Sequence, residues 1–159
     1  MQVHNIPPLY NENYEILILG SFPSQKSREA KFFYGHPQNR FWLVLSKILD
    51  EDLPKSIDEK REMLLKNKIA LWDVIKSCEI VGSSDISIKN ATPNDILSIL
   101  DKSNIKRIFV NGKTAEKYYN KYILKSTQIP AIVLPSTSPA NAAYSVEQLI
   151  NEWKIILEK

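Results

Sequence analysis

Short apolar runs alternate with amphipathic segments along this chain. The runs cover residues 14–19, 69–75, 107–110 and 131–134. Continuous apolar runs of this length are typical of strands buried on both faces of a parallel sheet. The pattern therefore predicts four strands, the first ending at Gly20 and the fourth before Pro135.

Helical patterns lie between the expected strands. They cover residues 40–49, 57–67, 92–100, 113–124 and a final helix after Ser145. Thr92 is expected as an N-cap with Pro93 as the first helical residue, and Ser145 with Gln148 matches a capping box. Strands alternating with helices predict an α/β protein whose parallel sheet is covered on both faces. Because the chain has no repeat and no linker-like stretch, one domain over 1–159 is expected.

Composition narrows the class of protein without identifying it. The 21 basic and 18 acidic residues leave a net charge of +3, which permits a nucleic-acid partner but does not require one. With Cys78, His4 and His36 as the only soft ligands, we expect no metal and no other cofactor. No signal peptide or membrane-length apolar run is evident, so a cytoplasmic protein that does not engage a membrane is expected.

Unusual residues follow three of the four expected strands. The first strand is followed by Gly20–Ser24 and the aromatic and polar segment 32–42, the second by Asp73, and the fourth by 134–141. Because the carboxyl ends of parallel strands share one edge of a sheet, we expect these segments to form one site.

From the residues alone, several of these features have two interpretations. Asn39 precedes a helix and is either its N-cap or a catalytic residue. Gly20–Ser24 and Ser136–Ser138 are either plain polar turns or parts of a site. A buried Asp73 is costly unless a group pairs with it.

Common catalytic motifs are missing from the strand ends. No GxxxxGK[ST], GxGxxG or GxSxG sequence follows a predicted strand, which disfavours a P-loop NTPase, a dinucleotide site and an α/β-hydrolase elbow. A polar and aromatic pocket without a nucleophile or phosphate cradle suits the recognition of a flat heteroaromatic group.

Two motifs resemble those of the uracil-DNA glycosylase superfamily. One is the G-x-x-P loop at Gly20–Pro23 with the downstream H-P-x-N-R-F-W at His36–Trp42, and the other is P-S-x-S at Pro135–Ser138. The resemblance is closest to the hypoxanthine-DNA (deoxyinosine) glycosylase branch, which is related to the mismatch-specific uracil and thymine glycosylases. It implies a three-layer α/β/α sandwich around a four-stranded parallel sheet.

One departure from the superfamily concerns the first motif. Mismatch-specific uracil glycosylases have a catalytic asparagine where this chain has Phe22, and no acid lies within Gly20–Ser24. The hypoxanthine branch shares the G-S-F-P form and relies on the asparagine of H-P-x-N, which is Asn39 here. The resemblance thus implies that Asn39 orients the attacking water.

The resemblance also implies a monofunctional enzyme that flips a deaminated base out of DNA. Tyr34 would stack on the base, Phe22 would add a second wall, and Asp73 would accept a hydrogen bond from N1–H of hypoxanthine. Further base contacts come from the backbone at Ser21 and from Pro23. The DNA contacts implied are Ser24, Lys113, Ser136, Thr137, Ser138 and Pro139. The expected partner is damaged DNA, duplex or single-stranded, and the expected state is a monomer.

Other functions compete with this interpretation. The same fold could act on uracil or thymine opposite guanine, or on an etheno adduct. It could also be an inert DNA-binding or nucleobase-binding protein that has lost its activating residue. An unrelated small α/β hydrolase would use Ser136 or Ser138 as its nucleophile.

Overall fold

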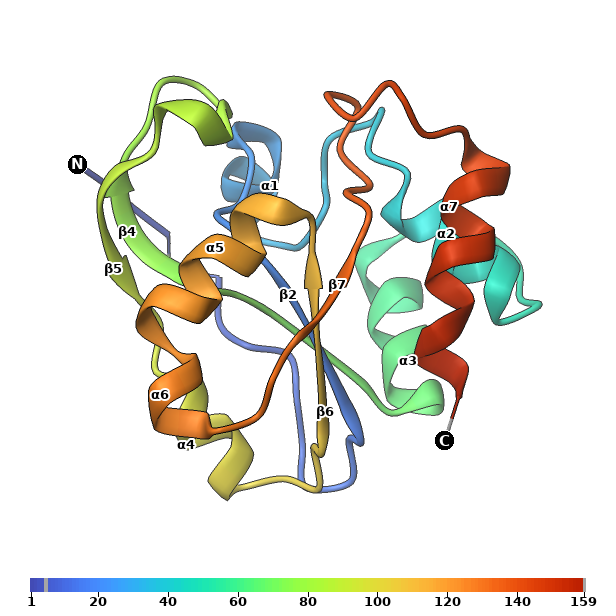
Figure 1. Ribbon diagram of the computed structural model, residues 1–159. Coiled ribbons are helices and arrows are strands. Elements are labelled where there is room, and N and C mark those ends of the chain that lie inside the picture. The colour runs from blue at the N-terminus through green and yellow to red at the C-terminus, as the bar shows by residue number, and fades with distance from the viewer. Residues whose placement is uncertain (5, 159) are drawn as a thin grey trace.

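The computed structural model describes residues 1–4 and 6–158. Four strands form its central sheet, all parallel, in the order β3–β2–β6–β7 (Figure 1). Their bounds are Ile16–Gly20 for β2, Ile69–Asp73 for β3, Arg107–Asn111 for β6 and Ile132–Leu134 for β7. The four predicted strands are thereby confirmed, with the first of them in the interior of the sheet.

Side chains alternate between the two faces of the sheet. Ile16 and Ile18 belong to one buried cluster, and Leu17 and Leu19 belong to another. Helices α2 (Phe41–Ile48), α3 (Ile57–Asn67) and α7 (Val146–Trp153) cover the first face. Helices α4 (Ile96–Asp101), α5 (Lys113–Tyr122) and α6 (Leu124–Thr127) cover the second (Figure 1). The expected α/β/α sandwich is confirmed.

A second sheet was not predicted from the sequence. Strands β1 (Gln2–Val3), β4 (Ile75–Glu79) and β5 (Lys89–Pro93) pair antiparallel in the order β1–β4–β5. The apolar run 69–75 therefore spans two strands, which separate at Val74.

The predicted start of the third helical segment, residues 92–100, was wrong. Thr92 and Pro93 lie in β5, where proline is tolerated because β5 is an edge strand. Helix α4 instead begins at Ile96, and the Asp95 side chain accepts a hydrogen bond from the Ser98 N–H at 3.2 Å.

The remaining elements are short. They are α1 (Gln25–Ala30) and the 3-10 turns η1 (Asp85–Ser87) and η2 (Lys154–Leu157). The predicted capping box at Ser145 and Gln148 opens α7. No helix within residues 1–4 and 6–158 is long and apolar enough to cross a membrane.

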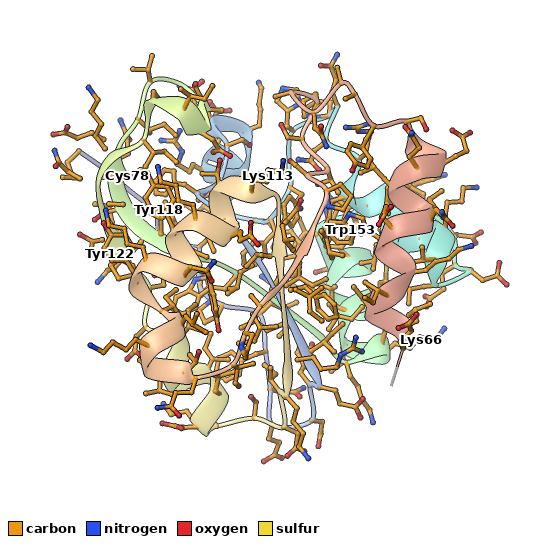
Figure 2. The ribbon with its side chains drawn as sticks, viewed as in Figure 1. Lys66, Cys78, Lys113, Tyr118, Tyr122 and Trp153 are labelled. Atoms are coloured by element: carbon orange, nitrogen blue, oxygen red, sulfur yellow. The ribbon has the colours of Figure 1, made fainter. Side chains whose placement is uncertain are left out.

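Trp153 connects the last helix to the edge of the sheet that carries the loops. Its ring is fully buried, and Figure 2 shows it on the sheet side of α7. It packs edge to face on Phe41, with 5.7 Å between the ring centroids. Its indole N–H donates to the carbonyl of Pro135 at 2.9 Å. The loop after β7 is therefore anchored to the core at its first residue.

Replacing Trp153 tests this anchor. Trp153→Ala is expected to lower the free energy of unfolding by about 3–5 kcal/mol, because it empties a large core site and removes the indole donor. Trp153→Phe, which keeps an aromatic ring, is expected to cost about 1–2 kcal/mol. Urea unfolding measures both, and a loss below about 1 kcal/mol for the alanine variant would contradict the anchoring role.

Candidate functional site

The carboxyl ends of the parallel strands open into a pocket of about 580 Å³. Ligand pockets in proteins are commonly of this size. Residues from the loops after β2 and β7, from the ends of β3 and β6, and from the turn between β4 and β5 line it. The structure brings together at this pocket most of the residues singled out from the sequence: Ser21, Phe22, Pro23, Ser24, Tyr34, Asn39, Asp73, Ser136, Thr137, Ser138 and Pro139.

Strand register brings Asp73 against Gly20 in the pocket. The two residues are direct partners at the ends of β3 and β2. A Cβ atom built on Gly20 would lie 2.6 Å from Asp73 Oδ1 and 3.2 Å from the Tyr34 hydroxyl. Position 20 therefore has no room for a side chain, and the carboxyl and the hydroxyl occupy the space that a side chain would fill.

The Asp73 carboxyl is buried without a partner. Asp73 is 4% exposed, and its Oδ2 has no hydrogen-bond partner in the described part of the chain. Burial, with a further contribution from the nearby Asp85, raises the pKa of Asp73 from 3.8 to about 7. Buried polar groups are normally hydrogen-bonded, so an orphaned carboxyl facing a pocket indicates a site for a ligand donor.

Tyr34 adds a second unpartnered group to the pocket. Its buried hydroxyl has no partner at hydrogen-bond geometry among residues 1–4 and 6–158. Burial, reinforced by Asp73 and opposed by the nearby Asn111 side chain, raises the pKa of Tyr34. The backbone of Tyr34 is left-handed with φ 52°, a conformation that costs a bulky residue about 1–3 kcal/mol. The neighbouring Gly35 N–H donates to Ser27 Oγ at 2.8 Å, which holds this segment against α1.

The ring of Tyr34 stacks on Phe41. Their centroids lie 4.1 Å apart with an interplanar angle of 20°. Phe41 is fully buried at the start of α2, so it forms a rigid base for the tyrosine. The pocket therefore has an aromatic wall that is fixed from behind.

Phe22 lines the pocket, but most of its ring is buried in the core. It is 7% exposed, packs edge to face on His4 at 5.3 Å and lies under the Arg28 guanidinium at 5.2 Å. His4, to which sequence reasoning assigned no role, is itself buried, and its Nε2–H donates to the carbonyl of Ile75 at 2.8 Å. The His4 ring thus supports the first loop from below.

The backbone of the first loop offers free donors. Within the described residues, the N–H groups of Ser21, Phe22 and Ser24 donate to no protein acceptor, although all three residues line the pocket. By contrast, the carbonyls of Gly20 and Ser21 accept from Val74 and Ile75, which fixes the loop relative to β3. Aligned free N–H groups at such a turn favour a ligand that carries or develops negative charge.

Hydrogen bonds determine which way the Asn39 amide points. Its Oδ1 accepts from the backbone N–H of Phe41 at 2.9 Å and from the Thr137 hydroxyl at 2.9 Å. The Thr137 hydroxyl in turn accepts from Asn111 Nδ2 at 3.0 Å. Since a backbone N–H can only donate, the oxygen must face Phe41, and the NH₂ group remains for the pocket. The N-cap of α2 is Arg40 and not Asn39, but Asn39 Oδ1 still accepts from the first helical N–H, and its NH₂ group is left as a donor at the pocket.

Arg40 organises the loop after β7. Its guanidinium donates to the backbone carbonyls of Ser138 at 2.9 Å, Asn141 at 3.0 Å and Tyr144. The backbone N–H of Arg40 donates to the carbonyl of Thr137 at 3.0 Å. Sequence reasoning missed this role, because which carbonyls an arginine reaches depends on a contact across about a hundred residues.

Three of the residues expected to contact DNA lie differently from that expectation. Thr137 is fully buried and its hydroxyl is used within the protein, so its side chain does not reach the outer surface. The Ser24 hydroxyl caps α1, accepting from the Ser27 N–H at 3.1 Å. Lys113 does not line the pocket, although it begins α5 at the same edge of the sheet (Figure 2).

The turn between β4 and β5 contributes a wall that sequence reasoning missed. This hairpin tip, residues 80–88, brings Ser83, Ser84, Asp85 and Ile86 to the pocket. The Ser21 hydroxyl donates to Asp85 Oδ1 at 3.1 Å. Because β4 and β5 were not predicted, no pattern in the sequence placed this turn beside the first loop.

Two further features bear on the chemistry of the pocket. Across the described residues, no three His, Cys, Asp or Glu side chains are grouped so as to hold a metal ion. Lys26 is the one lysine among the described lining residues; its exposed amine lies 4.0 Å from a carboxylate oxygen of Glu29.

Comparisons with known proteins agree on one family. The model of the uracil DNA glycosylase superfamily matches residues 7–156. A hypoxanthine DNA glycosylase of Methanosarcina barkeri is 38% identical over 143 residues, covering 89% of each chain. Another from Methanosarcina acetivorans is 36% identical over 152 residues, covering 94% of each. The solution NMR structure of a candidate uracil DNA glycosylase from Methanosarcina acetivorans superposes with a TM-score of 0.82 at 33% identity, over 96% of this chain and 94% of that one.

The burial of the Asp73 carboxyl should affect how the free energy of unfolding depends on pH. Because the folded pKa of Asp73 lies above its unfolded value, its contribution to stability is lost as pH rises from about 4 through 7. A shift from 3.8 to about 7 corresponds to at most ~4 kcal/mol. Asp73→Asn is therefore expected to be more stable than the wild type at pH 8, by about 1–3 kcal/mol, and to lose this advantage toward pH 4.5.

Urea unfolding at both pH values measures this difference. The matched control is Asp52→Asn, which removes an exposed aspartate from a loop and should show no comparable gain at pH 8. Parallel pH dependence of the wild type and Asp73→Asn would show that the carboxyl carries no burial penalty.

Proposed function

The chain belongs to the uracil-DNA glycosylase superfamily, and we propose that it is a monofunctional DNA glycosylase that removes hypoxanthine from deoxyinosine. The observation that carries the proposal is the buried, unpartnered carboxyl of Asp73 at the end of β3. The proposed enzyme comprises residues 1–159 as one domain and takes damaged DNA as its partner.

Asp73 supplies the acceptor that reads the base. Hypoxanthine has an N1–H that can donate a hydrogen bond to an ionised carboxylate. N1 of adenine is itself an acceptor and would face the carboxylate with a lone pair. Leaving such a buried pair unmatched is costly, so the contact discriminates against the normal base. The neighbouring Tyr34 hydroxyl, which has no hydrogen-bond partner among the described residues, is a donor for the base edge.

The base reaches this position only after extrusion from the DNA stack. Extrusion costs a few kcal/mol and less where pairing is weak, as in a mismatched pair. The Tyr34 ring, supported by Phe41, recovers about 1–3 kcal/mol by stacking on the base. Phe22 contributes less than a second wall would, because its ring lies mainly in the core.

Cleavage of the glycosidic bond leaves positive charge on the sugar and negative charge on the departing base. The free N–H groups of Ser21, Phe22 and Ser24 are the donors for that negative charge. The departing base anion takes up the proton that the attacking water releases, so the proposed cleavage needs no side-chain acid, and fixed dipoles stabilise the negative charge until then.

Asn39 holds the attacking water through its NH₂ group. Because both acceptor positions of Oδ1 are used by Phe41 and Thr137, the amide positions the water by donating to it and does not take its proton. Water that attacks an oxocarbenium-like sugar needs orientation more than activation, since the sugar is already strongly electrophilic. An amide in this role predicts a modest rate.

The loop after β7 carries the contacts to the DNA backbone. The Arg40 guanidinium holds the backbone of this loop, so that Ser136, Ser138 and Pro139 line the pocket on a fixed frame. Phosphate contacts from such side chains position the duplex without reading its sequence. Thr137 acts from within, as the link between Asn111 and Asn39.

A single-turnover assay tests the function and Asn39 together. Duplexes with one deoxyinosine, one deoxyuridine opposite guanine, or no lesion are incubated with excess protein and then treated with alkali. Wild type is expected to give alkali-dependent cutting at deoxyinosine, with little at deoxyuridine. Asn39→Ala is expected to act about 10²-fold more slowly, because the water loses its positioning donor.

The matched control is Asn13→Ala, which removes an exposed asparagine outside the pocket and should keep the wild-type rate. Preferred cutting at deoxyuridine would move the substrate to uracil within the same superfamily. An unchanged rate for Asn39→Ala would remove it from the mechanism, and no excision of any lesion would favour an inert binding protein. Cutting without alkali would contradict a monofunctional enzyme and point to the Lys26 amine.

A further inference from the structure

The hairpin tip presents two apolar side chains to solvent beside the pocket. Ile86 is 98% exposed and Val81 is 76% exposed, and both belong to the tip defined above, residues 80–88. Ile86 also lines the pocket. Single exposed apolar residues are ordinary on protein surfaces, so the meaning of this pair depends on where and how firmly it is held.

Hydrogen bonds hold the tip to the first loop and to α1. The Ser21 hydroxyl donates to Asp85 at 3.1 Å, and the backbone N–H of Gln25 donates to Ser83 Oγ at 3.0 Å. The Arg28 guanidinium donates to the carbonyl of Gly82 at 3.0 Å. These three tethers come from separate positions along the chain, so the exposure of Ile86 does not come from a loose loop.

Further bonds within the tip stiffen the turn itself. The N–H of Val81 donates to Ser87 Oγ at 2.8 Å, and the Ser87 hydroxyl donates to the carbonyl of Ser84 at 2.6 Å. The N–H of Ile88 donates to the carbonyl of Asp85 at 3.2 Å. Ile86 is thus raised on a braced turn, with its side chain directed away from the protein.

The opposite wall of the pocket lacks a comparable side chain. Figure 1 shows the hairpin tip on one side of the loop-bearing edge and the loop after β7 on the other. The exposed positions of that loop are Pro139, Ala140, Ala142 and Ala143. Each of those side chains is smaller than isoleucine, and Ile86 is the largest exposed apolar group among the described residues that line the pocket.

We propose that Ile86 is a wedge that enters the DNA base stack beside the lesion and keeps the extruded nucleotide in the pocket. This inference rests on the proposed function, since it requires a flipped base in the adjacent pocket. The partner of the hairpin tip is duplex DNA, and the Ile86 side chain contacts the faces of the bases. The cost of unstacking a base step is offset by the larger protein surface that the DNA then contacts. Two segments would contact the duplex: the loop after β7 on the DNA backbone, and the hairpin tip between the bases.

The position of the charges agrees with such an approach. The Asp85 carboxylate is turned toward Ser21 and not outward with Ile86, whereas the Arg28 cation lies under the tip on Gly82. Two small polar residues, Ser83 and Ser84, precede Asp85 and Ile86 in the tip.

Fluorescence of 2-aminopurine detects the wedge without requiring chemistry. The probe is placed next to a tetrahydrofuran abasic analogue in a duplex, where unstacking of the neighbouring base raises its emission. The wild type is expected to raise the emission, Ile86→Leu to preserve that rise, and Ile86→Ala to lose most of it. In single-turnover assays Ile86→Ala should excise hypoxanthine about 10-fold more slowly from duplex DNA, and at the wild-type rate from single strands, where there is no stack to open.

The control is Leu65→Ala, another exposed aliphatic residue, located on α3 just before β3 begins and therefore at the other edge of the sheet. It should match the wild type in both assays. Equal emission and equal duplex rates for Ile86→Ala and wild type would overturn the wedge, as would an equal slowing on single and double strands. A rise in emission that depends on Ile86, in a protein that excises no hypoxanthine, would support the wedge and reject the proposed substrate.

Discussion

The register between β2 and β3 is the constraint on which the site depends. It pairs Gly20 with Asp73 at the last position of both strands, where a Cβ atom on residue 20 would collide with the carboxyl. The same pairing leads the backbone on to Val74 and Ile75, whose N–H groups hold the first loop. A shift by one residue would turn every side chain of the strand to the opposite face and remove the carboxyl from the pocket. The burial penalty of Asp73 is sustained because the two large apolar clusters on either side of the sheet hold this register.

Around that constraint, the protein uses its polar side chains to fix one another and leaves selected atoms free. Thr137 and Phe41 occupy the Asn39 oxygen, so the amino group remains for the pocket. The guanidinium of Arg40, the next residue in sequence, donates hydrogen bonds to three carbonyls of the loop after β7. Of the buried side-chain atoms left without partners in the described structure, Asp73 Oδ2 and the Tyr34 hydroxyl belong to residues that line the pocket, and these are the two that a flipped base would satisfy. Such preorganisation lets fixed dipoles stabilise charge as it develops.

The four central strands were predictable because each is a continuous apolar run, and the shared edge of a parallel sheet then brought Asp73, Asn39 and the two loops together. The sheet β1–β4–β5 was not, since β4 and β5 are short, mixed in polarity and half-exposed, and the Thr92-Pro93 pair equally suits a helix start. Because β4 and β5 were not predicted, the hairpin tip between them and the position of Ile86 were not predicted either. Hydrogen-bond direction at Asn39 and the burial of Thr137 lay beyond any sequence pattern, because both arise from contacts between segments about a hundred residues apart.

The most direct measurement of the central claim compares hypoxanthine with unsubstituted purine, each placed once in the same duplex, by single-turnover excision. Purine fits the same space and stacks on Tyr34, but it has no N1–H for the Asp73 carboxylate to accept. The account predicts that purine is released about 10²-fold more slowly or worse, because it leaves the buried acceptor unpaired. Release of the two bases at comparable rates would contradict it, and would mean that Asp73 does not read the base.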